Sequence, residues 1–116
     1  MKILDLPLIG EWYTMIESGI KTEEYRIVKP YWCKRFTNCN HSLCWMRDNN
    51  GECVLLKHQE ANNKKGYTHV RFRYGYTKRT MLREIESITI GYGKPEWGAP
   101  TDKQVFIIRF KKGGEQ

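Results

Sequence analysis

Apolar and polar residues alternate over several short stretches of the chain, which is the pattern of β-strands with one buried face. The clearest stretch is 68–74, where apolar side chains alternate with His69, Arg71 and Arg73. Patterns of this kind predict seven strands, at residues 2–6, 21–28, 43–46, 53–57, 68–74, 80–90 and 104–110. Many short strands separated by turn residues favour a small barrel over a sheet built from β-α-β units.

Two short segments show helical spacing instead. In residues 10–18, Trp12 and its apolar neighbours fall at positions i, i+3 and i+4, which gives one apolar face. Gly19 follows, where a glycine commonly ends a helix because it adopts the left-handed conformation at little cost. Pro30 fits the first position of a second helix. The sequence therefore predicts an α+β chain, mainly β, with one or two short helices in a single domain, residues 1–116.

The composition bears on the cellular location of the protein. No run of 18 apolar residues occurs, so we expect no transmembrane helix and no membrane association. The first six residues contain a lysine and an aspartate, and their apolar stretch is too short for a secretory signal. We therefore expect a cytoplasmic protein.

The four cysteines are irregularly spaced, with no C-x-x-C pair: Cys33, Cys39, Cys44 and Cys53. Closed zinc sites usually contain one tight ligand pair. A zinc site that includes His41 is the alternative to reduced, partly buried thiols. We expect the thiols to be reduced, with no metal and no cofactor.

Positive charge is concentrated in residues 57–83. Eight of the 20 lysines and arginines lie there with a single acid, Glu60, and this excess equals the net charge of the whole chain, +7. Such a local excess attracts phosphates. Tyr74 and Tyr76 lie among these cations, a combination that single-strand binders use. We expect one contiguous cationic surface and RNA, another nucleic acid or a nucleotide as partner; the alternatives are an ordinary solvated surface and an acidic protein partner.

Three motifs carry a resemblance to a known family. The first runs from the predicted helix into the second strand, as Trp12-Tyr13-x-Met15-Ile16-x-Ser18-Gly19-x-Lys21-Thr22-x-Glu24-x-Arg26. The other two are Arg73-Tyr74-Gly75-Tyr76 and Gly93-Lys94-Pro95-Glu96-Trp97-Gly98. On these residues the chain resembles the ASCH family of PUA-like domains over most of its length, although residues 34–66 match nothing in it.

The resemblance implies a small PUA-like mixed β-barrel with a helix that closes a cleft, and a function related to RNA or nucleosides. Some bacterial members are amidohydrolases that act on acylated cytidine through a catalytic lysine, a threonine and a distant glutamate. Lys21 and Arg26 match the lysine and arginine of the family motif. Glu24 occupies the position of the threonine, and Glu96 is a candidate for the glutamate by its region of the chain alone.

Residue types alone indicate a similar site. Glu24 and Arg26 are two positions apart on a strand, so their side chains share one face, which Lys21 can reach from just before the strand. Such an ion-paired cluster could hold a base edge, a phosphate or an amide carbonyl, or it could be a structural salt bridge. We expect a binding module for RNA or nucleotides whose ligand contacts are Lys21, Glu24, Arg26, Arg71, Arg73, Tyr74, Tyr76 and Trp97. The alternative is a small hydrolase of nucleosides or RNA, with Lys21 and Glu24 as catalytic residues.

Overall fold

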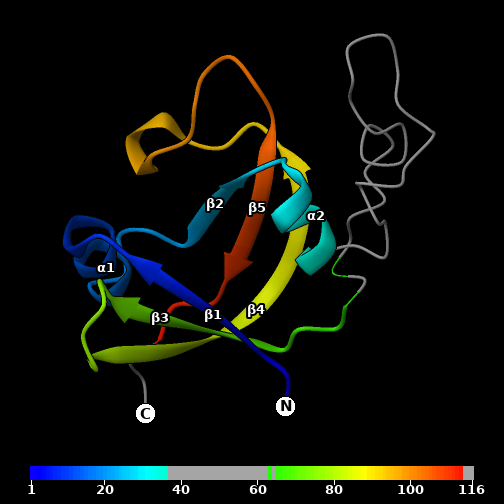
Figure 1. Ribbon diagram of the computed structural model, residues 1–116. Coiled ribbons are helices and arrows are strands. Elements are labelled where there is room, and N and C mark those ends of the chain that lie inside the picture. Colours follow the sequence, from blue (N-terminus) through cyan, green and yellow to red (C-terminus); the bar gives the residue numbers. More distant parts are fainter. Residues whose placement is uncertain (37–62, 64, 114–116) are drawn as a thin grey trace, which may run out of the picture.

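The computed structural model describes residues 1–36, 63 and 65–113. The described elements are, in chain order, β1 (Ile3–Leu8), α1 (Gly10–Glu17), β2 (Glu23–Ile27), α2 (Pro30–Phe36), β3 (His69–Tyr74), β4 (Thr80–Gly91), the 3₁₀ turn η2 (Pro95–Trp97) and β5 (Val105–Phe110) (Figure 1). The strands predicted at 43–46 and 53–57 lie outside the described residues. The predicted α+β class, mainly β with two short helices, is confirmed.

The five strands form one mixed sheet in the order β1-β3-β4-β5-β2. β1 runs parallel to β3, whereas the other three pairs are antiparallel. β4 is long enough to pair with β3 through its first half and with β5 through its second half, and its register with β5 shifts between Ile85 and Ser87. Irregularities of this kind bend a strand, and the sheet curls visibly around β4 in Figure 1.

The sheet is not closed into the barrel that the sequence predicted. β1 and β2 lie at the two ends of the strand order, and these two described strands do not pair with each other. Closing a barrel requires a hydrogen-bonded ladder between the first and last strands. Here residues from both edge strands line a cleft instead, as described below.

Several element boundaries differ from the sequence prediction; β2, for example, begins at Glu23 rather than at residue 21. β1 continues through Pro7 to Leu8, beyond the predicted end at residue 6. A proline is tolerated there because β1 is an edge strand, on which an N–H that faces away from the sheet is not needed. Residues 95–97 form η2 inside a segment that the sequence predicted to be a loop.

The main core joins buried residues of the sheet to buried residues of both helices. Val70 and Phe72 of β3 are fully buried, which confirms the predicted alternation of this strand. The Phe36 ring of α2 is also fully buried, with its centroid 5.0 Å from that of Phe106 on β5. Burial of one such side chain contributes about 1.5–3 kcal/mol. Fully buried residues from β1, α1, β4 and β5 complete this core: Leu4, Leu6, Tyr13, Ile16, Ile88, Phe106 and Ile108.

Among the described residues, no helix combines the length and the apolar character that crossing a membrane requires.

Candidate functional site

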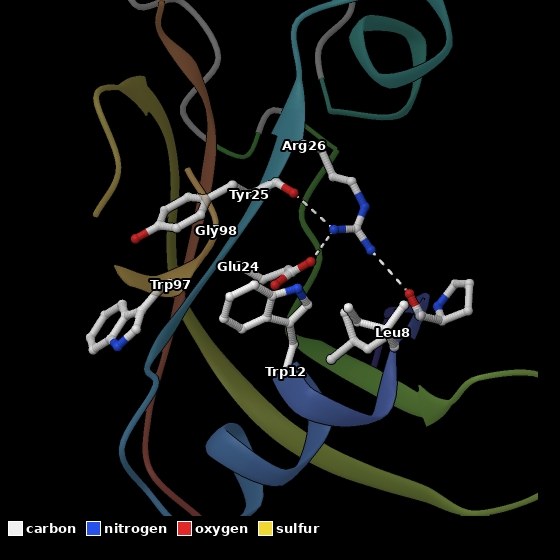
Figure 2. Close-up of a pocket in the computed structure, with 9 residues that line it drawn as sticks. Leu8, Trp12, Glu24, Tyr25, Arg26, Trp97 and Gly98 are labelled. Atoms are coloured by element: carbon white, nitrogen blue, oxygen red, sulfur yellow. Dashed lines mark hydrogen bonds and ion pairs between the residues drawn. The ribbon is translucent and has the colours of Figure 1, made fainter. Parts of the chain in front are cut away.

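A cleft of about 300 Å³ lies between the two edge strands of the sheet. The end of β1 and the start of α1 form one side, β2 forms another, and the end of η2 forms a third (Figure 2). Arg26 on β2 donates from Nη2 to the Pro7 carbonyl oxygen on β1 at 3.3 Å, so one guanidinium spans the two edges. The lining residues are Pro7, Leu8, Ile9, Trp12, Glu24, Tyr25, Arg26, Trp97 and Gly98.

The Glu24 carboxylate is held between two cations. Lys21 Nζ lies 2.9 Å from Glu24 Oε1, and Arg26 Nη1 contacts Glu24 Oε2 and donates to the Tyr25 carbonyl oxygen at 2.8 Å. The Glu24 and Arg26 side chains are only 7% and 16% exposed. The three residues meet in one ion-paired cluster, and Glu24 and Arg26 share one face of β2, as the strand pattern predicted. The expectation that all three line one pocket at the mouth of a barrel is not met, because Lys21 does not line the cleft and the sheet is open.

Lys21 supports the cleft from behind and does not line it. Its side chain is completely buried, and Nζ donates to the carbonyl oxygens of Glu23 at 2.6 Å and Trp97 at 3.1 Å. With Glu24 Oε1, the three ammonium hydrogens have three acceptors. Burial lowers the pKa of Lys21, whereas the adjacent Glu24 carboxylate acts in the opposite direction. The ammonium group therefore ties η2 to β2 and fixes the carboxylate between them.

Of the aromatic rings at the cleft, the Trp12 indole lies next to Glu24 in Figure 2. The Trp97 ring extends away from Glu24 and Arg26 in this view and packs against the cluster that contains Tyr25, and Lys94 Nζ lies 4.4 Å from its centroid. Lys21 Nζ lies 5.3 Å from the centroid of the Trp12 ring and 5.0 Å from that of Tyr25. A buried cation thus already occupies the inner faces of two of these rings.

Two glycines of the third sequence motif have a physical role here. Gly98 has a φ of 101°, and a Cβ at this position would lie 3.1 Å from the Trp12 ring. A Cβ on Gly93 would lie 2.5 Å from the Tyr25 ring. The left-handed backbone at Gly98 favours glycine, and at both positions only glycine leaves room for the neighbouring aromatic ring. These two glycines therefore shape the cleft through the backbone.

The Tyr25 hydroxyl connects β2 to the segment before η2. It donates to Glu23 Oε1 at 2.7 Å and accepts from the Lys94 amide at 3.0 Å. Burial raises the pKa of Tyr25, so the hydroxyl stays protonated. Burial also opposes ionisation of Glu23, but hydrogen bonds from Tyr25 and Arg109 outweigh it and hold the pKa of this carboxyl below its ordinary value.

The remaining predicted ligand residues, apart from Trp97, lie outside the cleft. Arg71 makes a two-pronged ion pair with Asp5 across β1 and β3, which lowers the pKa of Asp5. The Tyr74 ring packs edge-on against Tyr13, with centroids 5.3 Å apart. Tyr76 is 96% exposed in the turn between β3 and β4. Arg73 lies on the outer face of β3, where Nη1 donates to the Thr77 carbonyl oxygen at 3.0 Å.

The cationic segment is only partly described. Lys57 and Lys64 lie outside the described residues, so a single contiguous surface of eight cations stays a prediction. Arg79 is paired with Glu17 at 2.8 Å and, like Arg71, has its charge largely neutralised.

The metal prediction also concerns residues that the structure leaves undescribed. Cys39, Cys44 and Cys53 lie outside the described residues, as does His41. The absence of a metal at these cysteines therefore stays a prediction.

Some cleft residues were not among the predicted ligand contacts. Trp12 has helical spacing that assigns it to the apolar face, and this face of α1 borders the cleft as well as the core. Ile9 directly precedes α1 and is 61% exposed at the cleft, and no local pattern in the sequence indicates this position. Glu96, suggested by the resemblance, is not among the residues that line the cleft.

The arrangement can bind a flat ligand with a polar edge, because the Trp12 indole lies beside one carboxylate and one guanidinium. No family model matches the chain, and no curated protein and no solved structure matches it either.

Proposed function

We propose that this protein is a binding module for RNA or nucleotides that holds one nucleobase in the cleft between β1 and β2. The observation that carries the proposal is the presence of Trp12, Trp97, Glu24 and Arg26 in one cleft of about 300 Å³. This volume is at the lower end of the range of small-molecule sites, which suits a single base.

The chemistry of the walls suits a base. Indole rings stack on bases of any sequence, with a contribution of about 1–3 kcal/mol per base. The Glu24 carboxylate can accept hydrogen bonds from exocyclic amino or ring N–H groups. The Arg26 guanidinium can donate to ring nitrogens or carbonyl oxygens. Stacking would retain the base, and these two polar groups would read its edge.

The electrostatics favour a neutral base attached to an anionic phosphate. The cluster of Lys21, Glu24 and Arg26 carries two positive charges and one negative charge, so its formal sum is +1. This positive excess would repel a cationic ligand, and the Lys21 ammonium already lies against the Trp12 and Tyr25 rings. A nucleotide avoids that repulsion and gains from the nearby positive charge.

Binding ranks above hydrolysis because of the environment of Lys21. A nucleophilic amine needs a free lone pair and access to substrate. Lys21 is completely buried, its hydrogens have three acceptors, and the Glu24 carboxylate stabilises the charged form. These features support a positioning role, in which Lys21 holds Glu24 and the Trp97 backbone in place.

The proposal includes membership of the ASCH family and a PUA-like fold. It is supported by the three sequence motifs, by a curled mixed sheet with a cleft beside α1, and by the structural role of Gly93 and Gly98 at that cleft.

Calorimetric titration with the four ribonucleoside 5′-monophosphates tests the binding proposal. We expect Trp12→Ala to weaken the best of these ligands about tenfold, since loss of the indole beside Glu24 removes a stacking contact of about 1.4 kcal/mol. Tyr92→Ala is the matched control, because Tyr92 is 65% exposed and does not line the cleft; we expect less than a twofold change. Equal effects of the two substitutions, or no binding of any nucleotide, would contradict the proposal.

A turnover assay tests the ranking of binding above catalysis. Wild type, Lys21→Ala and Glu24→Thr are incubated with acylated cytidine, and circular dichroism confirms that each variant is folded. We expect no turnover by wild type. Wild-type turnover that Lys21→Ala abolishes would prove the hydrolase alternative correct.

A further inference from the structure

We propose that the β3–β4 turn, residues 73–78, is a second binding site, which grips the sugar–phosphate backbone of a single-stranded nucleic acid while one base of that strand occupies the cleft. This inference rests on the proposed function of the cleft. It identifies the ligand as an oligonucleotide rather than a free nucleotide.

The turn is connected to the cleft by a short series of contacts. Arg26 lines the cleft and donates to the carbonyl oxygen of Pro7, and Pro7 is the register partner of Arg73 on the adjacent strand. Arg73 in turn donates to the carbonyl oxygen of Thr77 in the turn. The Gly75 amide donates to the carbonyl oxygen of Leu8, another cleft residue, at 2.7 Å. Since neighbouring strands are about 4.8 Å apart, the path from cleft to turn crosses little more than the width of β1.

The cations at the turn differ from the other cations of this region. Arg71 and Arg79 are each paired with a carboxylate, of Asp5 and Glu17 respectively. Within residues 1–36, 63 and 65–113, neither Arg73 nor Lys78 makes an ion pair with a carboxylate. In the part of the chain that the structure describes, both charges thus lack a carboxylate partner that would compete with phosphate, and both cations lie at the turn.

Hydrogen bonds hold the backbone of the turn, whereas the side chain of Tyr76 is exposed. Gly75 has a φ of 57°, the Thr77 hydroxyl donates to the Tyr74 carbonyl oxygen at 2.6 Å, and the Arg79 amide donates to that hydroxyl at 3.2 Å. The Tyr76 ring projects from this fixed turn and is 96% exposed. A rigid, exposed ring beside available cations is the arrangement with which single-strand binders stack a base and hold the phosphates next to it. A mononucleotide in the cleft has no second base to place on Tyr76.

The test is a fluorescence anisotropy titration of full-length protein with a labelled ten-nucleotide RNA of mixed sequence, at several salt concentrations. Arg73→Gln is compared with Arg71→Gln, which lies two positions away on the same outward face of β3 and removes the same single charge. We expect Arg73→Gln to weaken binding about fivefold and to reduce the slope of log affinity against log salt by about 0.7, the value of one phosphate contact on a single strand. Arg71→Gln should change affinity less than twofold.

Tyr76→Ser extends the test to the stacking contact. We expect it to weaken RNA binding about fivefold or more, and to leave the binding of 5′-monophosphates unchanged within twofold. Thermal unfolding of each variant confirms that the turn substitutions leave the fold intact.

The outcomes separate the inference from the proposed function. Equal effects of Arg73→Gln and Arg71→Gln, or no RNA binding at all, overturn the inference, while nucleotide binding that depends on Trp12 would still support the cleft. Weaker RNA binding in Arg73→Gln and Tyr76→Ser, with no effect of Trp12→Ala on nucleotides, would support the turn as a binding site and overturn the function of the cleft.

Discussion

Two groups of ion pairs in this protein use the same side-chain chemistry but differ in burial. In the cleft, Glu24 lies between Lys21 and Arg26, and its side chain is 7% exposed. On the outer face of the sheet, Asp5 and Arg71 form a well-aligned pair whose side chains are 50% and 40% exposed. The buried cluster has little access to water, whereas water screens the attraction between Asp5 and Arg71.

The difference teaches which charges can carry function. Removing one member of a buried pair leaves an uncompensated charge in a medium that solvates it poorly. Removing one member of an exposed pair leaves a charge that water solvates well, so such pairs contribute little to stability. The buried cluster therefore fixes the shape of the cleft, whereas the exposed pair chiefly determines which surface cations remain available to a partner.

The largest effect is expected from Glu24→Gln. The substitution leaves the Lys21 ammonium buried without its carboxylate, and we expect the free energy of unfolding to fall by about 3–5 kcal/mol. Urea denaturation at pH 7 measures it. Glu17→Gln is the matched control, because Glu17 is 45% exposed in its pair with Arg79 and should lose less than 1 kcal/mol.

The pH dependence of this loss follows from Lys21. The folded-state pKa of Lys21 lies below the ordinary value of 10.5. Between these two pKa values the unfolded state binds more protons than the folded state. The contribution of Lys21 to the free energy of unfolding therefore increases as pH rises through this window. Without Glu24 the pKa of Lys21 falls further, so the deficit of Glu24→Gln should shrink between pH 7 and pH 10. A deficit that stays constant with pH would show that the loss does not come from the Lys21 charge.

An intermediate effect is expected at Glu23, which is 12% exposed and accepts hydrogen bonds from Tyr25 and Arg109. Its folded-state pKa is below the ordinary value of 4.5, so its contribution is present above pH 4.5 and is lost as pH falls through the folded-state value. We expect Glu23→Gln to cost about 1.5–3 kcal/mol at pH 7. Below pH 4.5 its stability should depend less steeply on pH than that of wild type. Parallel profiles would contradict this assignment.

The smallest effect is expected from the exposed pair. Arg71→Gln and Asp5→Asn should each change the free energy of unfolding by less than about 1 kcal/mol, and 1 M salt should remove much of this difference. Urea titration of both variants and of their double mutant gives the coupling energy directly. A coupling well above 1 kcal/mol would mean that burial is not what separates the two groups of ion pairs.

Local patterns in the sequence were sufficient to predict several elements and one half of the site. The alternation in β3 determined that Val70 and Phe72 are buried, because successive side chains of a strand point to opposite faces. The same rule placed Glu24 and Arg26 on one face of β2, and the spacing of Lys21 brought it to Glu24. These features depend on neighbours in sequence, so the sequence by itself determined them.

The tertiary structure decided the features that join distant segments. No local pattern indicates that β1 and β2 remain unpaired, that α1 and η2 border the same cleft, or that the Lys21 ammonium donates to the Trp97 carbonyl oxygen. The sequence likewise marks Arg71 and Arg73 as equivalent. Only the parallel register of β1 and β3 places Asp5 opposite Arg71 and the carboxylate-free Pro7 opposite Arg73. Strand order and register are set by packing across the whole chain, and this packing distinguishes a neutralised cation from an available one.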